Sequence, residues 1–240
     1  MAFKDRINKN KKDAKGIFAV IGGHRLAGKS TLAGSLPGKT LMLQTELLET
    51  GSRSAKALSE KNGYTLDIID VKNFKDVLSI LEEVTKKDYD NVYIDSLTSL
   101  LDVQFVEDGM DKLKGNNIWD GFRKLGDKGV EFLMACKNIV DNKGINIFTT
   151  IAYKVKFDSD GETVDVQYDM KGQMTLGTLH KVCPIIVTVG KVNTEKDGLV
   201  RCLYTYDNGK YPGRIDYLLE EDNPKIIKPD LSLVLKLVNC

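Results

Sequence analysis

Residues 16–31 read GIFAVIGGHRLAGKST, and this stretch decides the fold class. Its first part, Gly16–Gly22, is a short apolar run rich in β-branched and aromatic residues that ends in glycine. Such a run is typical of a buried parallel strand. The rest contains the pattern G-x-x-x-x-G-K-S, and Lys29–Leu36 is expected to follow as a short helix that Pro37 and Gly38 end.

The glycine spacing fits a loop that wraps around a polyphosphate. Glycines allow successive main-chain N–H groups to point inward, and a following helix directs its positive end at the same anion. Lys29 is expected to reach the β- and γ-phosphates, Ser30 to place its hydroxyl on Mg²⁺, and Thr31 to help hold the α-phosphate. An ordinary glycine-rich turn would leave the Gly-Lys-Ser-Thr run after a buried strand unexplained. The candidate residues for binding ATP are Gly23, His24, Arg25, Leu26, Ala27, Gly28, Lys29, Ser30 and Thr31.

Two acidic positions follow predicted strands. Asn91–Asp95 (NVYID) is an apolar strand ending in an acid, and Asp95 is expected to hold Mg²⁺ through water. The alternative is an aspartate that caps the next turn. Glu46 follows the predicted strand Thr40–Thr45 at its carboxyl end, which is the ligand edge of an open α/β sheet. Glu46 is therefore preferred to Glu49 as the catalytic base, the alternative for both being a surface acid.

The remaining pattern to residue 152 continues the alternation of strands and helices. Further strands are predicted at Leu66–Asp70 and Ile145–Ala152, and 102–116 is expected to be irregular. A long helix is predicted over Ile118–Val140, which Gly126 and Gly129 are expected to break in two. A shorter helix is predicted after a capping asparagine, with an acid in its first turn and apolar residues on one face: Asn73, Asp76, Val77, Leu81 and Val84.

The last third is predicted to be mostly antiparallel, with no further helix. Two hairpins are expected, each around an Asp-containing turn that ends in glycine. Their strands are Val155–Phe157 with Thr163–Gln167, and Ile185–Val192 with Leu199–Tyr206. The fold class is therefore α/β, with a mostly parallel central sheet, helices on both faces and antiparallel hairpins in the C-terminal third.

The composition limits the function classes. The chain has 240 residues with 35 Lys plus Arg against 34 Asp plus Glu, so any nucleic-acid binding must come from a local patch. The cysteines form no C-x-x-C pair and are interpreted as reduced structural thiols. The charged N-terminus is not a secretory signal, and no run approaches a membrane span. A cytoplasmic protein is expected.

The motifs GGHRLAGKST, LMLQTE, NVYIDSLTSL and INIFTTIAY, with a β-rich tail, resemble the RecA-like ATPase core. More narrowly, they resemble the short P-loop proteins of phages of Gram-positive bacteria, which include RecA-like single-strand annealing proteins. The resemblance implies a RecA-like domain over 16–215, between a basic arm (1–15) and a C-terminal tail (216–240). It implies a homo-oligomer in the host cytoplasm with ATP near a subunit interface. It also implies single-stranded DNA near 102–117 and 153–180.

Carried over by position, the resemblance assigns catalytic or metal roles to Lys29, Ser30 and Asp95. Glu46 matches the catalytic acid, although it follows Gln44-Thr45 where RecA-like proteins often have Asp-Thr or Asp-Ala. Such proteins also supply a basic residue in trans to the γ-phosphate. The candidates are Lys181, Lys191, Lys210 and Arg214, each with a solvated surface charge as the alternative.

Several roles are left open by the sequence. Thr149 or Thr150 either senses the γ-phosphate or packs between strands. Trp119 and Phe122 lie among lysines and can stack bases, but their spacing of three favours packing in a helix core. The leading function is a Mg²⁺-dependent ATPase acting on single-stranded DNA in recombination, annealing or replication. The alternatives are a small-molecule or nucleotide kinase, which the scattered arginines argue against, and a non-catalytic nucleotide-dependent interaction module.

Overall fold

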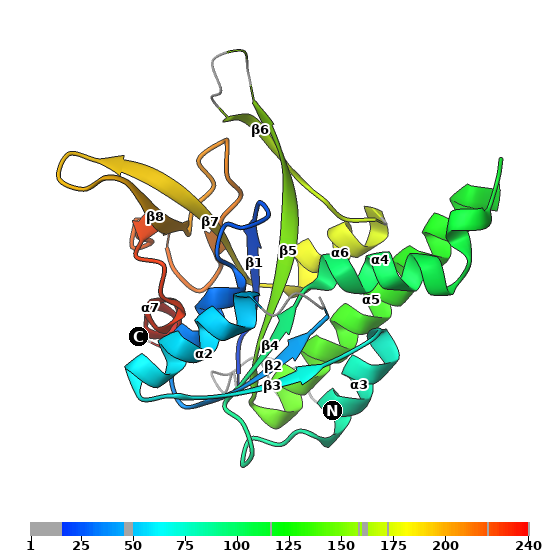
Figure 1. The fold of residues 1–240 in the computed structure, drawn as a ribbon, viewed down its shortest axis with the longest axis horizontal. Coiled ribbons are helices and arrows are strands. Elements are labelled where there is room, and N and C mark those ends of the chain that lie inside the picture. Colours follow the sequence, from blue (N-terminus) through cyan, green and yellow to red (C-terminus); the bar gives the residue numbers. More distant parts are fainter. Residues whose placement is uncertain are drawn as a thin grey trace, which may run out of the picture.

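The structure is a computed structural model that describes residues 16–45, 50–115, 117–157, 159, 163–171, 173–219 and 221–239. At its centre lies a 10-stranded sheet (Figure 1). The strands are β1 (Phe18–Gly23), β2 (Lys39–Gln44), β3 (Thr65–Asp70), β4 (Asn91–Asp95), β5 (Asn146–Phe157), β6 (Thr163–Tyr168), β7 (Ile185–Thr194), β8 (Gly198–Tyr204), β9 (Arg214–Ile215) and β10 (Ile226–Ile227). The helices are η2 (Ser30–Ser35), α2 (Thr50–Asn62), α3 (Phe74–Glu83), α4 (Leu97–Glu107), η3 (Met110–Lys112), α5 (Asn117–Lys143), α6 (Gln173–Val182) and α7 (Leu231–Asn239).

The predicted fold class is confirmed. The order along the sheet is β10-β8-β7-β1-β5-β4-β2-β3, with β6 paired to β5 and β9 to β7. Every pair from β7 to β3 along this path is parallel, whereas β8, β10, β6 and β9 pair in antiparallel fashion. The hairpins are therefore extensions of a parallel core, and β5 of the first one is a single long strand.

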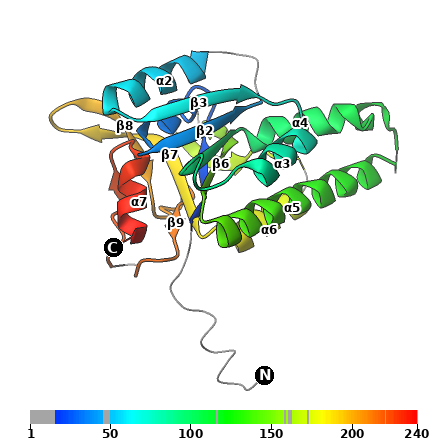
Figure 2. The same cartoon turned by 90° about the horizontal axis from the view of Figure 1, so that it is seen from below.

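Both faces of the parallel core are covered, which explains its continuous apolar strands. In β4, Val92 and Ile94 belong to one buried cluster and Tyr93 to the other, because successive side chains point to opposite faces. The first cluster lies under α3, α4, α5 and α6. The second lies under η2, α2 and α7, and Figures 1 and 2 show the two helical layers on opposite sides of the sheet.

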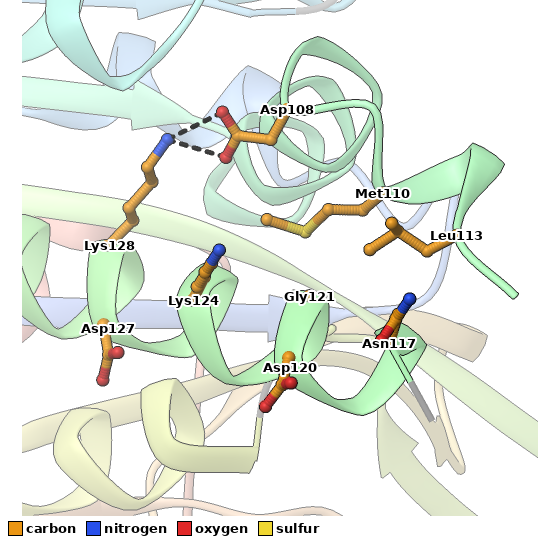
Figure 3. Close-up of a pocket in the computed structure, with 9 residues that line it drawn as sticks. All are labelled: Asp108, Met110, Leu113, Asn117, Asp120, Gly121, Lys124, Asp127 and Lys128. Atoms are coloured by element: carbon orange, nitrogen blue, oxygen red, sulfur yellow. Dashed lines mark hydrogen bonds and ion pairs between the residues drawn. The ribbon is translucent and has the colours of Figure 1, made fainter. Parts of the chain in front are cut away.

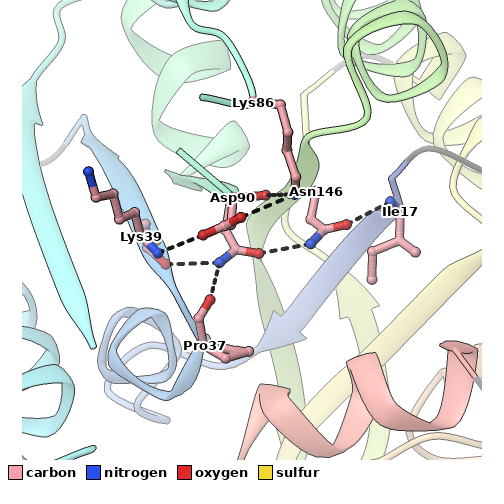
Figure 4. Close-up of polar contacts among 8 residues, drawn as sticks. Ile17, Pro37, Lys39, Lys86, Asp90 and Asn146 are labelled. Carbon is pink, nitrogen blue, oxygen red and sulfur yellow. Dashed lines mark hydrogen bonds and ion pairs between the residues drawn. The ribbon is translucent and has the colours of Figure 1, made fainter. Parts of the chain in front are cut away.

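The amino ends of the central strands are held together by a side-chain network (Figure 4). Asn146 accepts a hydrogen bond from the Ile17 amide and donates one to Asn91, which in turn donates to the Pro37 carbonyl. Asp90 accepts from the Lys39 amide. These bonds fix β1, β2, β4 and β5 in register at one edge, so their carboxyl ends meet at the opposite edge.

The helix predicted after Asn73 is confirmed. The Asn73 side chain accepts a hydrogen bond from the Asp76 amide at 3.1 Å, and Val77, Leu81 and Val84 are buried. The prediction that 102–116 is irregular is wrong, because α4 covers its first part. The Ser96 hydroxyl caps α4 by accepting from the Ser99 amide, and the helix buries Leu97, Leu100 and Leu101 together with the polar Thr98 and Gln104.

The predicted break in the long helix is also wrong. The helix α5 runs unbroken for 27 residues. Its glycines allow α6 to pack closely, since a Cβ on Gly129 would lie 2.3 Å from the Thr175 hydroxyl and one on Gly126 would lie 3.3 Å from Met174. The helices α6 and α7 contradict the expectation of a helix-free last third. In α7, Leu231, Val234 and Leu235 are buried against the core.

Three cysteines, Cys136, Cys183 and Cys202, are buried free thiols, as expected; Cys240 and residues 1–15 lie outside the described residues. Burial raises the pKa of all three thiols. Within the described part of the chain, no helix is both long and apolar enough to cross a membrane.

Candidate functional site

The glycine-rich stretch forms a loop at the carboxyl end of β1. The loop turns through Leu26 (φ 62°) and Gly28 (φ 97°), and the Leu26 side chain is 95% exposed at its tip. The Lys29 Nζ donates hydrogen bonds to the carbonyls of Gly23 and His24, both at 3.0 Å. The ammonium group is therefore folded over the loop, close to the main chain that precedes it.

The helix after the loop is shorter and tighter than predicted. It is a six-residue 3₁₀ helix, Ser30–Ser35, in place of a helix over Lys29–Leu36. Gly34 accounts for its close packing on α2, because a Cβ there would lie 2.0 Å from the Ala55 carbonyl oxygen. A helix this short adds little dipole, so the groups available to an anion here are the loop's main-chain amides and Lys29.

Neighbouring elements hold the loop in place. The buried Tyr93 hydroxyl on β4 donates to the Lys29 carbonyl at 2.6 Å. Gly51 in α2 faces Ser30, where a Cβ would lie 2.6 Å from the serine Cβ and 2.8 Å from its hydroxyl. Gly22 leaves room for the Tyr153 ring, since a Cβ there would lie 1.9 Å from the tyrosine oxygen. None of these three supports could be predicted from the sequence, because each joins residues far apart in the chain.

Asp95 ends β4 on the sheet face that carries the loop's helix. It shares this face with Tyr93, whose cluster includes Leu32 and Ala33 of η2. The strand β5 lies between β1 and β4, and its Thr150 hydroxyl donates to the Asp95 Oδ1. The Asp95–Ser96 peptide bond is cis. Asp95 is thus oriented by a hydrogen bond from β5, and the cap of α4 is made by Ser96, not by Asp95.

The end of β2 is fastened to the same point. Thr45 donates from its amide and its hydroxyl to the Asp95 carbonyl, at 2.8 and 2.9 Å, and its hydroxyl accepts from the Ser96 amide. Glu46 and Glu49, the candidate bases, lie outside the described residues. Thr45, the last described residue before this gap, is therefore bonded to the main chain at Asp95.

The donor set fits Mg²⁺ bound together with a polyphosphate. Ser30 offers a hydroxyl and Asp95 a carboxylate, and Mg²⁺ in phosphate-transfer sites takes one or two protein oxygens with the substrate's phosphates. Among the described residues, no three His, Cys, Asp or Glu side chains form a cluster that could hold a metal.

The candidate trans-acting cations have different surroundings. The Arg214 guanidinium donates to the carbonyls of His180 and Cys183 and so fastens the end of α6. Lys181 lies in α6, and Lys191 lies on β7 directly opposite Arg201 of β8. Arg214 has a structural role in this arrangement.

The expectation that Trp119 packs in a helix core is wrong. Its side chain is 74% exposed near the start of α5. Its ring lies 6.5 Å from that of the half-buried Phe122, which stacks on Phe105 of α4 at 5.3 Å. The Lys171 ammonium lies 4.4 Å from the centre of the Phe105 ring. These rings form an aromatic row, here defined as Phe105, Phe122 and Trp119, on the arm made by α4 and α5.

The same arm carries a cavity of about 630 Å³ between η3 and α5 (Figure 3). At the wall of this cavity, the Lys128 ammonium donates hydrogen bonds to the Asp108 carboxylate. The Lys124 side chain points into the cavity, whereas those of Asp120 and Asp127 point away from Met110. The cavity does not include the phosphate loop.

Strand, glycine-rich loop, short helix and strand-end aspartate, on a mostly parallel sheet, define the chain as a P-loop nucleotide-binding protein. A family model described as the AAA domain matches residues 15–215, and the chain belongs to this family of P-loop ATPases. No curated protein matches the sequence closely enough to add a named relative.

Proposed function

We propose that this P-loop ATPase hydrolyses Mg²⁺-bound ATP in response to single-stranded DNA, in recombination, annealing or replication of the kind served by RecA-like phage proteins. The observation that carries the hydrolysis is the convergence of the Gly23–Thr31 loop and Asp95 on one face and one edge of the sheet. That arrangement is what the transfer of a phosphoryl group to water requires: positioning and charge stabilisation.

The residues of the site have separate roles in this proposal. Lys29 exchanges its two carbonyl partners for phosphate oxygens, because an ammonium binds an anionic oxygen more strongly than a neutral one. Ser30 and Asp95 hold Mg²⁺, which supplies charge stabilisation when bound. Thr150 keeps the Asp95 carboxylate in orientation. Glu46 orients or deprotonates the water, and the residue before it, Thr45, is anchored on the Asp95 carbonyl.

The DNA part of the proposal rests on the aromatic row. Exposed rings next to cations bind single strands by stacking on bases, at about 1–3 kcal/mol per base. Among the described residues, no ion pair is found for Lys112, Lys114 or Lys124 of this arm, which leaves them for phosphate contact. The helix α4 joins Ser96, next to the metal-site aspartate, to Phe105 over about 14 Å. It offers a direct mechanical link between the two sites.

The test combines turnover with a built-in probe. Trp119 is the one tryptophan of the chain, so its fluorescence reports on the arm alone. We expect single-stranded oligonucleotides to quench this fluorescence and to raise the ATPase rate. Trp119→Ala should lose the stimulation and keep basal turnover. Tyr217→Ala, which removes an exposed aromatic residue elsewhere, should behave as wild type.

The other outcomes separate the competing functions. Phosphate transfer to a nucleoside or metabolite in place of water would indicate a kinase. Nucleotide binding without turnover, with or without DNA, would indicate an interaction module. A homo-oligomer with ATP near the subunit interface is part of the proposal. Light scattering with and without ATP and oligonucleotide tests it, and a monomer with and without them would be the contrary result.

A further inference from the structure

The hairpin of β7 and β8 brings a second cation to the phosphate loop. A Cβ placed on Gly28 would lie 2.7 Å from a terminal nitrogen of the Arg201 guanidinium and 2.9 Å from its Cζ. The guanidinium therefore lies against the loop backbone, in the space that glycine leaves open. Gly28 adopts φ 97°, so the same position favours glycine for its conformation as well as for this contact.

The hairpin is fixed in this orientation by its own core contacts. Leu203, two residues after Arg201 and on the same face of β8, is buried in the cluster that contains Ala27 of the loop. Val189 of β7 lies opposite Leu203, and its carbonyl would be 3.3 Å from a Cβ on Gly23. The base of the hairpin is thus packed on the loop, and Arg201 extends over it from a rigid strand.

The charge of Arg201 has no counter-ion in the described part of the chain. The side chain is exposed, and no carboxylate there lies within ion-pair distance of it. Lys29 adds a second cation beside the same main chain. Two cations held against a turn of main-chain amides repel each other, and an anion of high charge relieves that repulsion.

We infer that Arg201 binds the terminal phosphates of the nucleoside triphosphate held by its own chain's loop. This inference rests on the proposed function and adds a residue to it. A guanidinium reaches phosphate oxygens with two parallel N–H groups, which suits a planar approach over Gly28. It also differs from the trans-acting cation that the RecA resemblance implies, because Arg201 stands on the loop of the same subunit.

Nucleotide affinity separates this role from that of the loop itself. Loss of a charged hydrogen-bonding partner should weaken ATP binding by about 10- to 100-fold in Arg201→Ala, with a smaller loss for AMP, which lacks the outer phosphates. Arg201→Lys should recover part of the affinity. Lys196→Ala, which removes an exposed charge at the turn of the same hairpin, should bind as wild type. Without nucleotide, thermal unfolding of Arg201→Ala should be unchanged, since the side chain is exposed.

A mixing experiment tests the cis assignment. Lys29→Ala and Arg201→Ala protomers are combined at equal amounts, and ATPase activity is compared with each alone. We expect no recovery, because each protomer lacks a residue of its own site. Recovery in the mixture would overturn the assignment by placing Arg201 in a neighbour's site. Unchanged ATP affinity in Arg201→Ala, with binding lost in Lys29→Ala, would also overturn it and leave the phosphate loop standing.

Discussion

The Thr150 hydroxyl on β5 donates a hydrogen bond to Oδ1 of Asp95 on β4, at the carboxyl edge of the sheet. The neighbouring Thr149 points to the other face, where its buried hydroxyl has no hydrogen-bond partner among the described residues. Two adjacent threonines thus differ in role. One orients the Asp95 carboxylate, which we propose holds Mg²⁺, and the other fills space in the core.

Thr150→Val should therefore raise the Mg²⁺ concentration needed for half-maximal ATP hydrolysis. The hydrogen bond lost is worth about 0.5–1.5 kcal/mol, which corresponds to about a 2- to 10-fold shift. Thr149→Val is the matched control and should leave the Mg²⁺ titration unchanged. Equal shifts in the two variants would show that the titration responds to core packing and not to the orientation of Asp95.

Gly51→Ala should weaken Mg²⁺ binding through Ser30. The new methyl group would lie within 3 Å of both the Cβ and the hydroxyl of Ser30, so the serine must move away from α2. We expect a reduced ATPase rate that excess Mg²⁺ partly restores. Lys56→Ala, which changes an exposed position in the same helix, is the control and should be neutral. Wild-type Mg²⁺ dependence in Gly51→Ala would contradict the contact.

Tyr93→Phe should loosen the phosphate loop without changing the packing of the core. The ring stays, and only the hydrogen bond to the Lys29 carbonyl is lost, at about 0.5–1.5 kcal/mol. Because the carbonyl keeps the Leu32 amide as a partner, we expect a modest loss of nucleotide affinity and only a small change in melting temperature. Calorimetric titration with ATP checks the first and thermal unfolding the second. A large drop in stability with normal affinity would assign Tyr93 to the core alone.

Gly22→Ala should destabilise the fold by about 1–3 kcal/mol, the usual cost of overpacking a core. Its methyl group would overlap the buried Tyr153 hydroxyl. Gly177→Ala in α6, where no atom of the described residues lies within 4 Å of the added Cβ, should instead stabilise by about 0.5–1 kcal/mol, because alanine favours a helix. Urea unfolding of both variants gives the comparison. Equal effects of the same sign would refute the packing argument.

Much of the parallel core could be predicted from sequence because its signals are local. The apolar strands β1, β2, β4 and β5 are continuous runs bounded by glycine or polar residues. Asn73 caps its helix through the Asp76 amide, which is only three residues further along the chain. The helix α2 escaped prediction because its buried side is made of small residues such as Ala55 and Ser59, so no apolar stripe marks it. In α5, glycine was misinterpreted as a break, although it serves close packing on Thr175.

The same difference between local signals and distant contacts applies to the candidate site. The loop and Asp95 are candidates from the sequence alone, because the loop motif is continuous and Asp95 ends an apolar strand. The supports from Tyr93, Gly51 and Arg201 could not be found, because each contact joins elements that only the folded sheet brings together. The exposure of Trp119 was missed for a related reason: its spacing from Phe122 fits a buried stripe, and only the projecting arm of α4 and α5 leaves it uncovered.

Calorimetric titration of Mg²⁺-ATP into wild type, Lys29→Ala and Lys39→Ala tests the central claim most directly. Lys39 begins β2 with an exposed side chain and controls for loss of a lysine charge near the same sheet. We expect binding to wild type and to Lys39→Ala, and none to Lys29→Ala. Equal binding by all three proteins would show that the nucleotide is held elsewhere, and the loop at Gly23–Thr31 would no longer be the site.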